Sequence, residues 1–193
     1  MAKRKYQFKP DRFGAGVLNK LYIPKGGRLR ILRWTLYALV FLAALVLQDS
    51  VLSRYRFFGG VIELAPAVLM LVTVAQGTQN GSVYALICSM IYVFAGTGPD
   101  YYCIFLLTLY ACAGALLREE FLRRSGATIW LCAGLALTLY ELSVFGVGLA
   151  FGLTDPGRIT AFLMTAALSV LVMPVLNALI LRIGKIGGEQ WKE

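Results

Sequence analysis

The sequence predicts an all-α polytopic membrane protein with six transmembrane helices and both termini in the cytoplasm. Three observations lead to this fold class. First, 59% of the 193 residues are hydrophobic, whereas soluble domains average about 45–50%. Second, the apolar residues gather into six stretches. Third, the basic residues collect on alternate sides of these stretches, so most of the chain is expected to lie in lipid as one bundle.

Six apolar stretches are the candidate spans. A membrane-spanning helix needs about 20 apolar residues, with a range of about 17–25. The stretches are residues 34–47, 59–75, 82–95, 101–117, 127–153 and 159–181. The last two reach this length, the second and fourth lie at its lower edge, and the first reaches it if residues 31 and 52 are its ends. The third is the shortest, and its limits are the least defined.

Basic residues set the expected orientation. The predicted parts are a basic cytoplasmic arm at 1–33, a bundle at 34–184 and a short cytoplasmic tail at 185–193. Ten basic residues lie in the arm, and the other side of the bundle carries only Arg54, Arg56 and Arg158. Arg118, Arg123 and Arg124 in the loop after the fourth stretch are candidate cytoplasmic contacts. The positive-inside rule therefore places both termini in the cytoplasm.

The basic arm has two open interpretations. It lacks the modules and aromatic repeats of nucleic-acid-binding proteins, so no nucleic-acid partner is predicted. We expect it to set topology and to contact anionic membrane lipids, at about 1 kcal/mol per basic side chain. A cytoplasmic protein partner is the alternative. Residues 13–19 and 23–27 are glycine-rich and are expected to form loops.

The chain offers little catalytic chemistry. It has no histidine, which excludes Ser–His and Cys–His catalysis and His-ligated metals. The four cysteines lie inside apolar stretches without a CxxC motif, so we interpret them as small apolar filler. No catalytic residue, metal site or cofactor is predicted, and the protein is expected not to be an enzyme.

Two carboxyl groups inside the apolar stretches are functional candidates, because charges in a bilayer are costly. Glu63 lies early in the second stretch, where it can sit at a helix N-terminus with Pro66 in the first turn. Glu141 lies near the centre of the fifth stretch. The two are expected to differ in depth. For each, a structural role is weighed against a ligand, partner or proton role.

The fifth stretch has a small and polar face. Its members repeat at spacings of four and three residues, which places them on one side of a helix. They are Gly134, Thr138, Glu141, Phe145, Gly148 and Gly152. This face is expected to pack inward, with Gly148 and Gly152 as a GxxxG contact. In the sixth stretch Pro174 should kink or loosen the helix, and Thr165 or Ser169 is better placed than Asn177 to partner Glu141.

Local motifs resemble the rod shape-determining protein MreD family over roughly residues 34–184. The first span ends in residues 47–53 (LQDSVLS), similar to the family's Q-x-S-x-L. Residues 56–60 (RFFGG) followed by Glu63 resemble its route into the second helix, and residues 77–81 (GTQNG) its tight cytoplasmic turn. Tyr140 and Glu141 match its Y-E pair. The chain differs where the family often has Pro-Asp, at residues 62–63, and a late acidic residue in the third helix, at Tyr92.

The resemblance implies a non-enzymatic multi-pass subunit of the elongasome in the bacterial cytoplasmic (inner) membrane, serving cell shape and peptidoglycan synthesis. Its implied partners are single-pass MreC, and with it MreB filaments, RodA and a class B penicillin-binding protein. The family also resembles, in its six-helix architecture, the S components of energy-coupling-factor transporters. This likeness supplies the alternative function, binding of a small vitamin-like molecule. An assembly subunit should show small-residue contact surfaces, whereas a small-molecule binder should gather polar and aromatic residues at the outer side.

Overall fold

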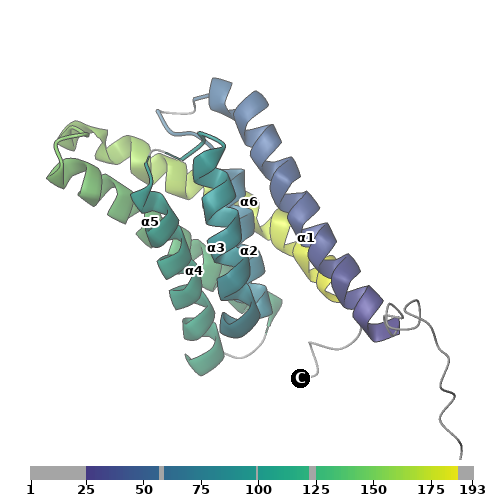
Figure 1. Cartoon of the computed structure of the whole chain (residues 1–193). Coiled ribbons are helices and arrows are strands. Elements are labelled where there is room, and N and C mark those ends of the chain that lie inside the picture. The colour runs from purple at the N-terminus through teal and green to yellow at the C-terminus, as the bar shows by residue number, and fades with distance from the viewer. Residues whose placement is uncertain (1–24, 57–58, 99, 122–124, 187–193) are drawn as a thin grey trace, which may run out of the picture.

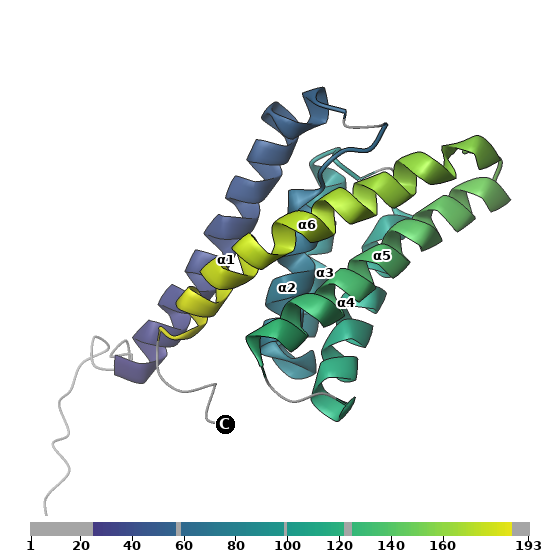
Figure 2. The ribbon, with the colours of Figure 1, turned by 180° about the vertical axis from the view of Figure 1, so that it is seen from behind.

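Six α-helices form one bundle in the computed structural model, which describes residues 25–56, 59–98, 100–121 and 125–186. Consecutive helices run in opposite directions, so the start of the first helix and the end of the last lie at the same end of the bundle (Figures 1 and 2). The helices are α1 (Lys25–Ser50), α2 (Leu64–Gln76), α3 (Thr78–Phe94), α4 (Tyr102–Phe121), α5 (Gly126–Ala150) and α6 (Ile159–Gly184), with short 3-10 helices η2 (Leu52–Arg54) and η3 (Pro156–Arg158).

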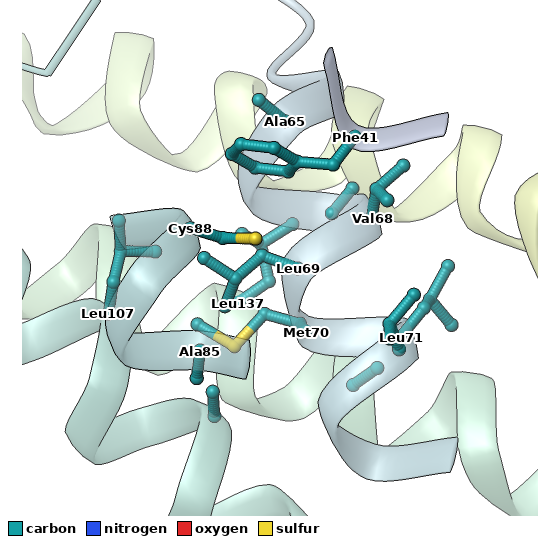
Figure 3. Packing of buried hydrophobic residues seen from close by; sticks show 14 of the residues in the cluster. Phe41, Ala65, Val68, Leu69, Met70, Leu71, Ala85, Cys88, Leu107 and Leu137 are labelled. Atoms are coloured by element: carbon teal, nitrogen blue, oxygen red, sulfur yellow. The ribbon is translucent and has the colours of Figure 1, made fainter. Parts of the chain in front are cut away.

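The short helix α2 is the centre of the bundle. All of its residues from Leu64 to Ala75 are buried, and each of the other five helices contacts it. A helix that is apolar on every side is stable only when it is surrounded. Figure 3 shows Phe41, Leu107 and Leu137 from three different helices packed around it. Helix α2 therefore positions the rest of the bundle.

Four helical segments among the described residues are long and apolar enough to cross a membrane. They are Arg28–Arg54, Tyr102–Phe121, Gly126–Ala150 and Pro156–Gly184. The predicted class, a helical multi-pass membrane protein, agrees with this. Helix α2 has 13 residues, or about 20 Å at 1.5 Å per residue, against a hydrocarbon core of about 30 Å. Because α2 is this short and α3 has only 17 residues, six crossings stay a prediction.

The second apolar stretch begins as extended chain and not as helix. Gly59 has φ +85°, a conformation that favours glycine. Gly60 lies directly on α6, where an added Cβ would be 2.7 Å from the backbone nitrogen of Thr165. The helix therefore starts at Leu64, with Glu63 as its N-cap residue and Pro66 in its first turn. The expected place of Glu63 at a helix N-terminus agrees with the structure.

The loop predicted at residues 23–27 is wrong for residues 25–27, whereas the boundary of the basic arm at residue 33 stays a prediction. Helix α1 already begins at Lys25, so residues 25–27 are helical and not a loop. Residues 28–33 are Arg, Leu and Ile, and both Arg and Leu favour helix, which extends the apolar helix backward. Arg33 is buried on it. The rest of the arm (1–24) and the end of the tail (187–193) lie outside the described residues. All four cysteines are free, and three are buried.

Candidate functional site

The two membrane carboxyl groups meet in the structure. Glu63 lies at the N-cap of α2 and Glu141 in the middle of α5, and their side chains interact directly with each other. The expectation that they differ in depth is wrong. Residues 60–63 are not helical, and Glu63 has an extended backbone with φ −97° and ψ 94°. Extended chain advances about 3.3 Å per residue, roughly twice the rise of a helix. This segment carries Glu63 inward until it faces Glu141.

Helices α1 and α3 add polar side chains to the pair. The Tyr92 hydroxyl donates to Glu63 Oε2 over 3.4 Å, and it also contacts the side chain of Gln48. Gln48 Oε1 accepts the backbone N–H of Ala65 at 2.9 Å, in the first turn of α2. Neither Tyr92 nor Gln48 was among the predicted site residues. Their signal in the sequence was a polar residue near the end of an apolar stretch.

Hydroxyl groups on α6 hold the extended segment. Thr165 Oγ1 accepts the backbone N–H of Val61 at 3.1 Å, and Ser169 Oγ accepts that of Glu63 at 2.9 Å. Non-helical backbone at membrane depth is stable only where such groups are satisfied by protein or water. We expected Thr165 or Ser169 to partner Glu141, whereas the structure shows them bonded to main-chain N–H groups.

A cavity of about 620 Å³ opens beside the carboxyl pair. Its described lining includes residues of the α1–α2, α3–α4 and α5–α6 connections. These three connections lie at the same end of the bundle (Figure 1). Ligand sites in proteins commonly measure about 300–1,000 Å³. The described lining residues are Arg56, Val61, Glu63, Thr97, Asp100, Tyr102, Tyr140, Glu141, Val144, Gly148, Leu153, Thr154 and Phe162.

The predicted inward face of α5 is largely buried. Gly134, Glu141, Phe145 and Gly148 are buried, and Glu141 is only 4% exposed. Thr138 is half-buried, and its hydroxyl donates to the Gly134 carbonyl in its own helix at 2.8 Å. The Thr138 hydroxyl therefore bonds within its own helix, and Thr138 is not among the described residues that line the cavity.

The end of α5 corrects the predicted GxxxG contact. The helix stops at Ala150, and Gly152 follows with φ +67°. The Leu153 N–H donates to the Gly148 carbonyl at 2.8 Å, and the Gly152 N–H to that of Leu149 at 3.1 Å. This pair of bonds is a Schellman cap, in which glycine supplies the left-handed residue. Gly152 is thus a turn residue, while Gly148 lines the cavity.

Three predicted residues remain. Pro174 and Asn177 of α6 are not among the described residues that line the cavity, whereas Tyr140 of α5 is. Helix α6 runs through Pro174, and the Asn177 amide donates to the Gly126 carbonyl at 2.9 Å, at the opposite end of α5 from the cavity. Neither approaches Glu141. Tyr140, by contrast, lines the cavity, is 2% exposed, and contacts Cys103 of α4 through its hydroxyl.

Arg118 is not the exposed cytoplasmic contact that we expected. It is 4% exposed, and its Nη1 atom donates to the Ala75 carbonyl at 3.1 Å. It thus supports the C-terminal end of α2, where a cation is favourable. The sequence prediction missed this because the residue follows an apolar stretch in a basic cluster. Arg123 and Arg124 lie outside the described residues.

Chemically, the site combines a carboxyl pair with tyrosine hydroxyls and aromatic walls. Two carboxyl groups in direct contact repel each other when both are charged, so they hold a proton or a cation between them. Among the described residues there is no group of three His, Cys, Asp or Glu side chains suited to a metal ion. Comparisons of the chain with protein-family models, curated proteins and solved structures found no match.

Proposed function

We propose that this protein is a non-enzymatic, multi-pass subunit of the bacterial cell-elongation machinery, similar to MreD. In this proposal it crosses the cytoplasmic membrane six times with both termini inside. It binds MreC, and through MreC it acts with MreB, RodA and a class B penicillin-binding protein. The observation that carries the proposal is that residues from three of the four motifs behind the resemblance meet at one site, while the fourth motif, residues 77–81, includes the α2–α3 turn.

This convergence involves α1, α2 and α5, and α5 lies far from the other two helices in the sequence. Gln48, from the motif that ends α1, binds the first turn of α2. Gly60 and Glu63, from the second motif, form the extended segment and the N-cap of α2. Glu141, from the Y-E pair, faces Glu63. Residues that form one structural unit support a shared architecture better than scattered matches do.

The small-residue surface of α4 is used inside the bundle. Ala111 and Ala115 of α4 are fully buried. Between them, Gly114 lies where an added Cβ would be 3.1 Å from Ala136 of α5. A partner helix must therefore bind elsewhere on the protein.

An apolar groove between α1 and α3 is a described surface suited to a partner helix. It encloses about 470 Å³. Ala38 is an exposed small residue on its wall, which allows close approach of another helix. We place the transmembrane helix of the single-pass partner here. The lining residues are Trp34, Ala38, Phe41, Leu42, Asn80, Val83, Tyr84, Ile87, Cys88 and Ile91.

The test is affinity purification from native membranes with quantitative mass spectrometry. The wild-type chain should recover a single-pass protein together with wall-synthesis enzymes. Ala38→Trp should lower that recovery by about tenfold or more, because an indole fills the groove. Leu171→Trp is the matched control, since Leu171 is 76% exposed on α6 and lies outside the groove. Recovery of none of these proteins by the wild-type chain would refute the proposal.

The cavity favours one alternative function. The S component of an energy-coupling-factor transporter needs a ligand site open at the outer side, and the cavity beside Glu63 and Tyr102 has the size and polar lining for one. The same purification separates the two functions, because an S component should recover ATP-hydrolysing subunits and no wall-synthesis enzymes.

A further inference from the structure

One carboxyl oxygen at the cavity lacks a partner. Glu141 lines the cavity and is 4% exposed, and its Oε1 atom has no hydrogen-bond partner. An unsatisfied buried acceptor costs free energy, more so when the group is charged. A ligand that donates a hydrogen bond from the cavity would remove this cost.

The neighbours of this oxygen define the charge of that ligand. Glu63 faces Glu141, and among the described residues Glu63 Oε2 also accepts the neutral hydroxyl of Tyr92. Two facing carboxylates with a neutral donor beside them attract a cation. We propose that the cavity binds a small organic cation, whose primary ammonium group lies between Glu63 and Glu141.

An ammonium group fits this site better than a metal ion. It carries three N–H donors, enough for Glu141 Oε1, a Glu63 oxygen and one further acceptor. Calcium takes six to eight oxygen ligands, whereas the carboxyl groups that interact here are two. When the ammonium enters, the proton that the two carboxyl groups share leaves to solvent, so the buried site keeps its charge balance.

The walls and the rim fit an organic molecule that carries the ammonium at one end. Tyr102, Tyr140 and Phe162 contribute aromatic rings, which favour apolar groups and cations. Arg56 and Asp100 are exposed lining residues. The rim thus carries one guanidinium and one carboxylate, so the end of the ligand that remains there is expected to be polar, while its ammonium lies between Glu63 and Glu141.

The test uses purified full-length protein in detergent, without partners, and measures binding calorimetrically and by thermal stabilisation. The probes are methylammonium, putrescine and tyramine. Tyrosol is the matched control for tyramine, because it replaces only the ammonium with a hydroxyl. We expect at least one amine to bind at millimolar concentration or below, and tyramine to bind at least about tenfold more tightly than tyrosol, the loss expected for one charge-assisted hydrogen bond.

Variants locate the site. Glu141→Gln should weaken amine binding at least about tenfold, and Val144→Phe, which fills the cavity from a buried lining residue, should also abolish it. Asp155→Asn is the matched control, because this exposed carboxylate lies between α5 and α6 and does not line the cavity. If Glu141→Gln does not fold, two measurements still test whether the cavity binds the ammonium group. They are the comparison of tyramine with tyrosol on the wild-type chain and amine binding by the Val144→Phe variant.

Two results would overturn the inference. One is that none of the three amines binds to the folded wild-type protein at 10 mM, roughly the weakest useful affinity for a charged site. The other is equal binding of tyramine and tyrosol. The binding test uses the purified protein without partners, so it is independent of the purification that tests the proposed function. The proposed amine site can therefore be refuted while the proposed function holds, and the reverse is also true.

Discussion

At the residue scale, Gly77 permits the tightest connection in the bundle. It alone joins α2 to α3, and its backbone has φ +84° and ψ 172°. This conformation is essentially restricted to glycine. The space at its Cα is also occupied, because an added Cβ would collide with Glu119 Oε1. Gly77 therefore lets the chain reverse direction between α2 and α3 within a single residue.

We predict that Gly77→Ala lowers the free energy of unfolding by about 1–3 kcal/mol, the usual cost of a residue held in such a conformation. Thermal unfolding in detergent measures this. Gly146→Ala is the control, because Gly146 lies exposed inside α5, and a Cβ there has no neighbour within 4 Å. It should be neutral or slightly stabilising. Equal midpoints for the two variants would contradict the prediction.

At the scale of elements, the last turn of α4 braces both helices of this reversal. Arg118 donates to the carbonyl of Ala75 at the C-terminal end of α2. Its neighbour Glu119 accepts the backbone N–H of Thr78 at 3.0 Å and the Thr78 hydroxyl at 2.6 Å, at the N-terminal end of α3. Each charge opposes the partial charge of the helix end that it meets. Arg118 and Glu119 thus join the last turn of α4 to the end of α2 and to the start of α3.

We predict that Glu119→Ala destabilises the protein by about 0.5–2 kcal/mol, as expected for the loss of an N-terminal cap. The amide protons of residues 78–81 should exchange faster, which hydrogen-exchange mass spectrometry detects. Glu120→Ala serves as the control, because Glu120 is an exposed carboxylate one position along the same helix. An identical exchange pattern in both variants would show that the cap contributes nothing.

At the scale of the whole molecule, the short central helix decides how the chain crosses the membrane. If α2 and α3 cross and the termini lie in the cytoplasm as predicted, the α2–α3 turn faces the cytoplasm. If they form a re-entrant hairpin, this turn stays within the membrane, and four helices cross. Both arrangements leave the two ends of the described chain on the same side (Figure 2). The position of the α2–α3 turn therefore distinguishes them.

We predict six crossings, measured by cysteine labelling with a membrane-impermeant reagent in a cysteine-free background. Ser53→Cys and Asp155→Cys should react in intact cells. Gln79→Cys and Glu120→Cys should react only after permeabilisation. All four positions are exposed in the structure. A Gln79→Cys variant that stays unlabelled after permeabilisation, while Glu120→Cys reacts, would indicate the re-entrant hairpin instead.

Features set by local pattern were predictable from the sequence. The apolar stretches place the six helices, and spacing along α5 identifies the buried face that contains Glu141. The order Glu63 and Pro66 marks the start of α2, because capping depends on neighbours along the chain. These are properties of a few consecutive residues, so no tertiary information is needed to find them.

Features set by contact between distant segments were not predictable. The extended segment before α2 depends on hydroxyl groups about a hundred residues later. The meeting of Glu63 and Glu141 follows from that segment. Gly152 has helical spacing from Gly148, yet the helix ends before reaching it, because spacing alone does not mark a helix end.

The two hydroxyls that bind the extended segment also specify the register of α6. Thr165 and Ser169 are one helical turn apart and match the N–H groups of Val61 and Glu63, which lie two residues apart in extended chain. The residues one turn before and after them are Ala161 and Met173, neither of which has a hydroxyl. A slip of α6 by one turn in either direction would therefore leave one half-buried N–H without an acceptor, so these two bonds oppose sliding of α6 along its axis.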